Sequence, residues 1–146
     1  MQQALDYLAA HHVMTLATHG PQGPWAAAVF YVNQGFDLYF LSSPRSRHAG
    51  DLALDERAAV TVQEDYIEWA DIRGVQLEGR IELLSGAEAV DARMLYGTKF
   101  PLIAATDAAP APIAAALARV HWYRLVATRA YFVDNSRGFG HREQVL

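Results

Sequence analysis

Residues 13–41 of this 146-residue chain read VMTLATHGPQGPWAAAVFYVNQGFDLYFL. The stretch contains three apolar runs, and the glycine-bearing segments His19–Pro24 and Asn33–Gly35 separate them. Runs of about four to eight β-branched and aromatic residues between such segments are typical of strands joined by tight turns. Tight turns between consecutive strands predict an antiparallel meander and exclude a βαβ unit here. The three strands are expected at 13–18, 25–32 and 36–41.

Helical and strand-like patterns alternate along the rest of the chain. Apolar spacing predicts a first helix over 3–12. Ser43 is expected to cap a second helix, with Pro44 as its first residue, that ends near Glu56. A capping box that begins at Ser85 predicts a third helix to about Tyr96. Further strands are expected at 58–62, 72–84, 121–125 and 129–133, helical turns at 113–118, an irregular segment at 102–112 and an exposed C-terminal tail.

These elements predict a single domain over residues 1–146, a length typical of one domain. Six or seven strands with inserted helices are typical of a small, mainly β (α+β) antiparallel barrel with short flanking helices. The glycines between the first two strands, Gly20 and Gly23, do not form a dinucleotide-binding fingerprint, because that motif joins a strand to a helix.

Composition limits the classes of function. The chain has no cysteine, which excludes disulfides, thiolate metal sites and cysteine nucleophiles. A formal net charge of −4 argues against nucleic-acid binding, and 52% hydrophobic residues exclude disorder. Only 19% of the residues are charged, so apolar surface is expected to be hidden in a homodimer interface. The longest apolar run, Trp25–Val32, is too short to span a membrane, and no secretory signal is recognised, so a cytoplasmic protein is expected.

The segment Leu41–His48, LSSPRSRH, combines three hydroxyls with three basic side chains where a strand ends and a helix is expected to begin. Unpaired N–H groups and the helix dipole favour an anion at such a place, and an arginine fork matches a phosphate. The segment is therefore a candidate phosphate site. The alternative is an ordinary capped helix whose arginines are solvated.

Other chemistry finds little support in the sequence. The six histidines show neither of the spacings H-x-x-x-H and H-E-x-x-H, so no metal site is expected. No G-x-S-x-G elbow, Walker loop or catalytic triad is evident, which leaves hydrolase chemistry without support. Trp25, Trp69 and Trp122 are candidates for the lining of a flat-ligand pocket, and the alternative places them in the core or in an interface.

An ordered set of short motifs runs through the chain: Met14–Thr18, Gly20–Trp25, Leu38–Ser42, Ser46–His48, Ala58–Val62 and Ile72–Gly79. In this order they resemble the FMN-binding split barrel of the pyridoxamine 5′-phosphate oxidase-like superfamily, from about His11 to His141. Together with Asp134–Gly140, the last motif also resembles a bacterial branch of that superfamily. The resemblance implies a six- to seven-stranded antiparallel split β-barrel.

The resemblance also implies a homodimer with two FMN sites at the subunit interface, a small-molecule substrate, and neither nucleic-acid nor membrane partners. The second strand would contact the flavin ring through its backbone, and the end of the third strand and the following helix would hold the phosphate. Gln76 from the partner subunit and a residue near the chain end are expected to complete the site. The implied cofactor-binding residues are Ala27, Ala28, Val29, Phe30, Ser42, Ser43, Arg47, His48, Gln76 and Trp122.

The chain departs from the enzymes that oxidise pyridoxamine phosphate. His48 stands where they carry a lysine, and a neutral histidine weakens a phosphate site at high pH. Their C-terminal arginine and histidine motif is not recognised. We therefore expect an FMN-dependent oxidoreductase that acts on another small molecule, with no catalytic residue named. The alternatives are a non-catalytic flavin-binding or stress module, a haem-binding barrel with His121, His141 or His48 on the iron, and a barrel that binds F420.

Overall fold

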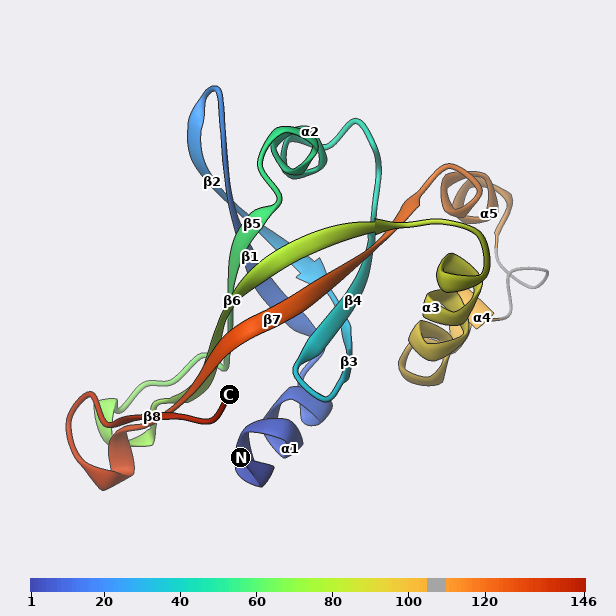
Figure 1. Cartoon of the computed structure of the whole chain (residues 1–146). Coiled ribbons are helices and arrows are strands. Elements are labelled where there is room, and N and C mark those ends of the chain that lie inside the picture. Colours follow the sequence, from blue (N-terminus) through green and yellow to red (C-terminus); the bar gives the residue numbers. More distant parts are fainter. Residues whose placement is uncertain (105–109) are drawn as a thin grey trace.

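The computed structural model describes residues 1–104 and 110–146, and its main feature is an eight-stranded antiparallel sheet (Figure 1). Seven strands follow one another in the order β2-β1-β5-β6-β7-β4-β3, and β8 pairs with β7. The strands are β1 (Val13–Gly20), β2 (Gly23–Phe30), β3 (Val32–Gln34), β4 (Asp37–Ser42), β5 (Arg57–Gln63), β6 (Arg73–Leu84), β7 (His121–Asp134) and β8 (Arg142–Gln144). The expected fold class, a mainly β antiparallel split barrel, is confirmed.

The sheet curves on itself, and its two ends approach each other without pairing. β2 forms one end and pairs with β1, whereas β3 and β4 form the other end. The chain passes from β2 to β3 through the single residue Tyr31, so the two ends stay close together. We call the opening between β2 and β4 the split.

Alternation along the strands separates a buried inner face from an outer face. In β1, Met14 and Leu16 are fully buried, whereas Ala17 between inner residues is exposed. α1 (Gln2–Ala10) closes one end of the barrel with Leu8, whose carbonyl accepts a hydrogen bond from the Tyr31 hydroxyl at 2.7 Å. Other fully buried side chains of this core are Leu38, Phe40, Val62, Val75 and Leu125.

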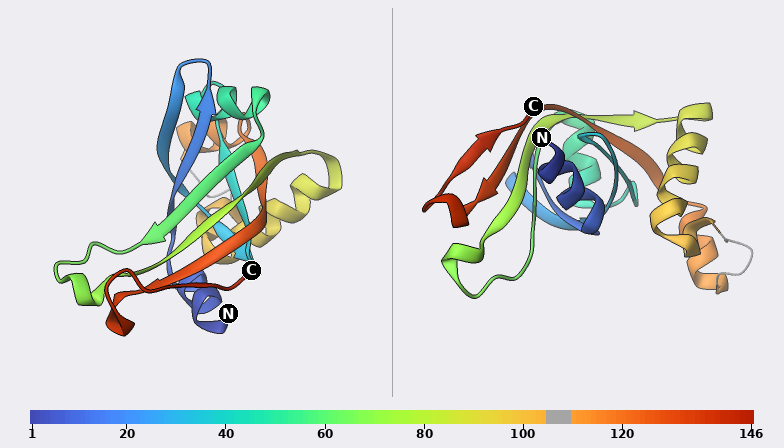
Figure 2. Two further views of the ribbon diagram at one scale, coloured as in Figure 1. Left: turned by 60° about the vertical axis from the view of Figure 1, so that its left-hand side comes forward. Right: turned by 90° about the horizontal axis from the view of Figure 1, so that it is seen from below.

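The remaining helices lie at the other end and on one side of the sheet (Figures 1 and 2). α2 (Arg47–Leu54) packs on β1 at the end away from α1. α3 (Gly86–Lys99) lies beside β4 and β7 and packs against α4 (Pro101–Ala104), and α5 (Ala111–Leu117) precedes β7. In the described part of the chain, no helix is both long and apolar enough to cross a membrane.

β7 corrects the prediction of two closing strands at 121–125 and 129–133. It is one strand of 14 residues that pairs with β6 from Trp122 to Asp134 with one interruption. The register shifts between Glu78 and Gly79, so that Thr128 has no partner and forms a β-bulge. A Cβ on Gly79 would lie 2.1 Å from the Val126 carbonyl oxygen. The prediction is wrong because a bulge with a glycine opposite lets one long strand bend without ending.

α2 begins at Arg47, later than predicted, and Ser46 is its N-cap. The Ser46 hydroxyl accepts a hydrogen bond from the Ala49 N–H at 3.2 Å. The Ser43 carbonyl accepts one from the Ser46 N–H at 3.1 Å, which makes a turn of the residues between them. The predicted Ser43 cap is wrong because this turn comes before the helix.

Three further expectations need correction. The run 25–32 breaks at Tyr31, whose N–H donates to the His12 carbonyl at 3.0 Å, and β3 then pairs with β4. Ser85 occupies the N-cap of α3, but its side chain makes no capping hydrogen bond. The C-terminal tail is not simply exposed, because η3 (Asn135–Arg137) and β8 fold back against the sheet. Of the segment 102–112, residues 102–104 and 111–112 are helical, and 105–109 lie outside the described residues.

Candidate functional site

Arg47 stands at the start of α2, where this helix meets the β1–β2 hairpin. Its guanidinium carbon lies 4.3 Å from the centre of the Trp25 ring, and its Nη2 donates to the Gln22 carbonyl at 3.3 Å. Its Nε–H is buried and has no hydrogen-bond partner. A cation that is held by a ring and a single carbonyl, with further N–H donors left over, is suited to receive an anion.

The hydroxyls of the turn before α2 are engaged within the turn. The Ser42 hydroxyl is hydrogen-bonded to Nε2 of His48 at 2.6 Å, and Ser43 Oγ accepts from the Arg45 N–H at 3.2 Å. Ser46 Oγ donates to the Ser43 carbonyl at 2.8 Å. These bonds fix the shape of the turn, while the N–H groups of the first helical turn have no partner within the helix backbone.

His48 follows Arg47 and is half-buried. Burial lowers the pKa of His48 below its usual value of 6.5, and the nearby Asp51 carboxylate acts in the opposite direction. A lowered pKa leaves the imidazole neutral at pH 7, a state in which Nε2 can accept the Ser42 proton. The positive charge beside the split therefore comes from the arginines of the turn and not from His48.

Asp51 fastens α2 to the sheet, and this residue is not among those that the sequence marks. Its carboxylate is only 5% exposed, and its Oδ2 accepts from the Thr18 hydroxyl at 2.9 Å. Gly20 makes room for it, because a Cβ there would lie 1.9 Å from Asp51 Oδ1. One feature of the sequence could have identified Asp51: it stands three residues after His48, which puts the two side chains on one face of a helix.

The residues 27–30 lie on β2, the edge strand that borders the split. Ala27 and Val29 stand opposite Leu16 and Met14 of β1 and share the inner face, whereas Ala28 and Phe30 share the outer face. Because β2 pairs with β1 alone in the described chain, one side of its backbone has no strand partner. This is the condition that backbone contacts to a ligand require.

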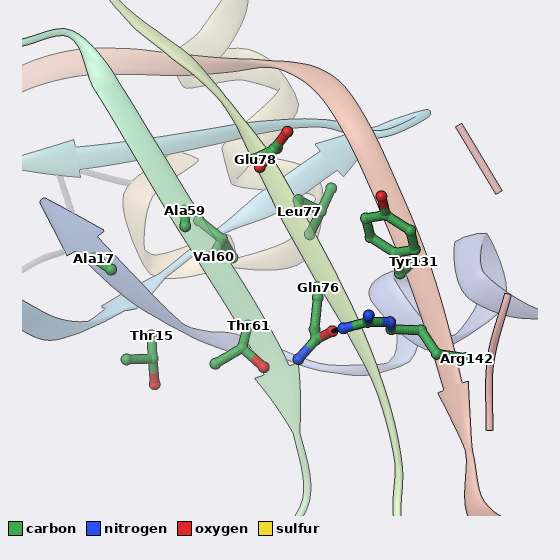
Figure 3. Close-up of a pocket in the computed structure, with 10 residues that line it drawn as sticks. All are labelled: Thr15, Ala17, Ala59, Val60, Thr61, Gln76, Leu77, Glu78, Tyr131 and Arg142. Atoms are coloured by element: carbon green, nitrogen blue, oxygen red, sulfur yellow. Dashed lines mark hydrogen bonds between the residues drawn. The ribbon is translucent and has the colours of Figure 1, made fainter. Parts of the chain in front are cut away.

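Gln76 lies on the outer face, in a hollow of about 350 Å³ that Figure 3 shows. Its Oε1 accepts from Nη1 of Arg142 at 3.4 Å, and the Arg142 guanidinium lies 5.1 Å from the centre of the Tyr131 ring. Tyr131 was among the aromatic residues that the sequence offered for a flat-ligand pocket, whereas Arg142 was missed, because only the pairing of β8 with β7 brings it to this place. The hollow is lined by Thr15, Ala17, Ala59, Val60, Thr61, Gln76, Leu77, Glu78, Tyr131 and Arg142.

Trp122 lies apart from the other predicted site residues within this chain. It stands opposite Leu41 on β4 and packs edge-on against Tyr96 of α3, with ring centroids 5.3 Å apart. Ser42, the next residue of β4, is on the buried inner face. One chain therefore gathers β2, the turn and the start of α2 around the split, and leaves Gln76 and Trp122 elsewhere.

The histidines do not assemble into a metal centre. Within residues 1–104 and 110–146, no group of three or more histidine, aspartate or glutamate side chains is placed to hold a metal ion. His121 is exposed at the start of β7. His141, in the turn before β8, has a buried Nε2 without a hydrogen-bond partner.

Sequence comparison relates the chain to known proteins along most of its length. The model of the family described as pyridoxamine 5′-phosphate oxidase matches residues 1–134. The UPF0306 protein YhbP of Salmonella paratyphi A is 33% identical over 136 residues, which make up 92% of this chain and 84% of that protein.

Solved structures share the fold at lower identity. A haem-binding protein from Mycobacterium smegmatis superposes with a TM-score of 0.73 at 23% identity, over 99% of this chain and 57% of that one. This chain thus spans little more than half the length of the mycobacterial protein. HutZ, the haem storage protein of Vibrio cholerae, superposes with a TM-score of 0.67 at 16% identity, over 85% and 87% of the two chains.

Proposed function

Because the chain belongs to the pyridoxamine 5′-phosphate oxidase-like split-barrel family, we propose that it is a flavoprotein that binds FMN along the split. The observation that carries this proposal is the Arg47 guanidinium, which bonds a carbonyl and a ring, bonds no carboxylate of the described residues, and keeps a buried Nε–H without a partner. A guanidinium fork matches the geometry of a phosphate. Arg47 and the first N–H groups of α2 would hold the FMN phosphate, with Ser42, Ser43 and His48 around it.

The edge strand β2 offers a place for the flavin ring. Trp25, which supports Arg47, and Ala28 are three residues apart on β2, a separation of about 10 Å along the strand. The ribityl chain of FMN joins the phosphate to the ring over a comparable distance. We therefore propose that the ring lies beside Ala27–Phe30 and bonds the backbone groups that face away from β1.

A homodimer is part of the proposal, because one chain does not bring Gln76 to β2. Gln76, Thr61, Thr15 and Ala28 stand side by side on four neighbouring strands, so Gln76 and Ala28 are about 14 Å apart. A second copy packed on the outer face would carry its own Gln76 to the split. Trp122 also stays a prediction, since in this chain it packs under α3.

The proposed activity is that of an oxidoreductase in the cytoplasm. FMN, when bound, supplies the transfer of hydride or single electrons. The residues of this chain would bind the phosphate, orient the ring along β2 and exclude water from one side of it. We propose a small-molecule substrate other than pyridoxamine phosphate, because His48 is neutral where a lysine would hold a further charge.

The test is a titration of the purified protein with FMN and, separately, with riboflavin, followed by tryptophan fluorescence and flavin absorbance. Replacing Arg47 (Arg47→Ala) should weaken FMN binding by roughly 1.5–3 kcal/mol, the value of a hydrogen bond to a charged group, and leave riboflavin binding nearly unchanged. Arg137→Ala is the matched control, because Arg137 pairs with Glu143 at the far end of the sheet. Equal FMN affinity of the Arg47→Ala variant and the unmodified protein would refute the phosphate assignment.

The same titration separates the proposal from haem binding. His141 favours this second candidate, because its buried Nε2 has no hydrogen-bond partner in the described part of the chain. The haem-binding relatives of similar fold are in keeping with it. A Soret band with added haemin, together with no flavin signal, would show that the ligand is haem and not FMN. A flavin complex that NADH and NADPH fail to reduce would favour a non-catalytic flavin-binding module. Preferential binding of F420 over FMN would favour a deazaflavin barrel.

A further inference from the structure

A second hollow lies next to the turn before α2. It measures about 520 Å³ and is lined by Ser43, Pro44, Arg45, Ala116, Arg119 and Val120. The two sides come together because Ser42 at the end of β4 pairs with His121 at the start of β7. The turn after β4 therefore faces the segment between α5 and β7, and two arginines line the same space.

Arg45 and Arg119 differ from the other arginines of the chain. The guanidinium groups of eight of the eleven arginines pair with an acceptor, and in six of these eight the acceptor is a carboxylate. Arg93 also has a partner. In the described part of the chain, the side chains of Arg45 and Arg119 alone among the arginines bond no acceptor. A shortage of acidic residues does not explain this, since the chain has 16 acidic and 12 basic residues.

Among the described residues that line the hollow, none carries a carboxylate that would neutralise these two arginines. Arg47, two residues beyond Arg45, bonds only a carbonyl and a ring, so three positive charges surround one turn without a bonded acid. Like charges that share a site repel each other, and an anion between them removes this cost. Guanidinium groups bind phosphate and carboxylate oxygens through paired N–H donors.

We propose that this hollow is a second anion site, which holds a phosphate group that the ligand carries beyond the single phosphate of FMN. The assignment of that ligand as a flavin rests on the proposed function, whereas the anion site itself does not. The class of ligand is a flavin nucleotide with a diphosphate, or a separate diphosphate-bearing co-substrate that binds beside FMN. Arg47 would hold the first phosphate, and Arg45 and Arg119 would hold the second anionic group.

The first experiment tests the anion site without a flavin. Inorganic pyrophosphate is titrated into the ¹⁵N-labelled protein, and the Nε–Hε signals of the arginines are followed by NMR. We expect saturable shifts at Arg45 and Arg119, and no shift at Arg137, whose guanidinium is bonded to Glu143. Shifts that do not saturate, or that are equal at Arg137, would overturn the proposal.

The second experiment compares FAD with FMN in Arg119→Gln and Arg45→Gln variants. Each substitution should weaken FAD binding about fivefold, as expected for one solvent-exposed ionic contact, and change FMN binding less than twofold. Equal effects on the two flavins, with pyrophosphate still bound at Arg45 and Arg119, would assign the site to a separate co-substrate. If pyrophosphate binds and neither flavin does, the second anion site stands and the proposed flavin function is wrong.

Discussion

Hydrogen bonds between residues around the split determine the position of Arg47. Thr18 bonds Asp51, and Asp51 holds α2 on the sheet. α2 in turn presents Arg47 to the ring of Trp25. Ser42 and His48 join the end of β4 to the same helix. The position of the Arg47 guanidinium therefore depends on the Ser42–His48 pair within the candidate site and on the buried Thr18–Asp51 pair outside it.

His48 is expected to make stability fall in mild acid. Burial lowers the pKa of His48 in the folded chain, so near pH 6.5 the unfolded chain binds a proton that the folded chain does not. The contribution of neutral His48 to stability is therefore complete above pH 6.5. It is lost as the pH falls through the pKa of the folded state. His48→Gln keeps an acceptor for Ser42 and removes the titrating group. The free energy of unfolding, measured with urea at pH 7.5 and pH 5, should fall more for the unmodified protein than for this variant. An equal fall in both would contradict a buried, neutral His48.

At the scale of elements, backbone crowding decides where β6 and β7 bend. β6 and β7 share the longest ladder of the sheet, and the bulge at Thr128 interrupts it opposite Gly79. β7 pairs with β4 before the bulge and with β8 after it. The hollow with Gln76 and the hollow beside Arg119 both depend on this one strand.

Two glycine substitutions that are expected to change the free energy of unfolding in opposite directions test this crowding. Gly79→Ala would place a Cβ 2.1 Å from the Val126 carbonyl oxygen and should lower the free energy of unfolding by about 1–3 kcal/mol. Gly50 in α2 has no atom within 4 Å of the corresponding Cβ position, so Gly50→Ala should raise stability by about 0.5–1 kcal/mol through helix propensity. Chemical denaturation of both variants provides the measurement. A neutral Gly79→Ala would mean that the bulge is not under steric constraint.

For the whole molecule, the arrangement of small side chains on the outer face favours a second copy. Ala17, Ala59 and Thr61 line the same hollow as Gln76, and Phe30 on this outer face is 55% exposed. Small side chains allow two sheets to approach closely, and an exposed aromatic residue gains most from being covered. This surface is the face on which we place the homodimer contact.

The dimer is tested by a charge placed on that face. Ala17→Arg should leave the fold intact, since its side chain is exposed in one chain, and should convert a species of twice the chain mass into one of the single chain mass in sedimentation. It should also weaken FMN binding, because the partner would no longer bring Gln76. Ala53→Arg on the exposed side of α2 is the control. A protein that sediments as a single chain before substitution would disprove the dimer.

Local patterns in the sequence predicted most strands of the sheet and a candidate phosphate segment, but not the single strand β7 or the break at Tyr31. Turn glycines between apolar runs predicted the first hairpins, because turn chemistry is a property of adjacent residues. The LSSPRSRH segment was a candidate anion site for the same reason, since hydroxyls, arginines and a helix start lie within eight residues.

Only the tertiary structure decided which of these groups remain free. The serine hydroxyls are hydrogen-bonded within residues 42–49, the buried Nε–H of Arg47 has no partner, and Arg45 and Arg119 line one hollow. β7 forms as one bent strand, and Gln76 stands three strands from Ala28. These outcomes depend on hydrogen-bond partners and packing neighbours tens of residues apart in the chain. Burial and strand register select such partners, and no local pattern of residue types encodes them.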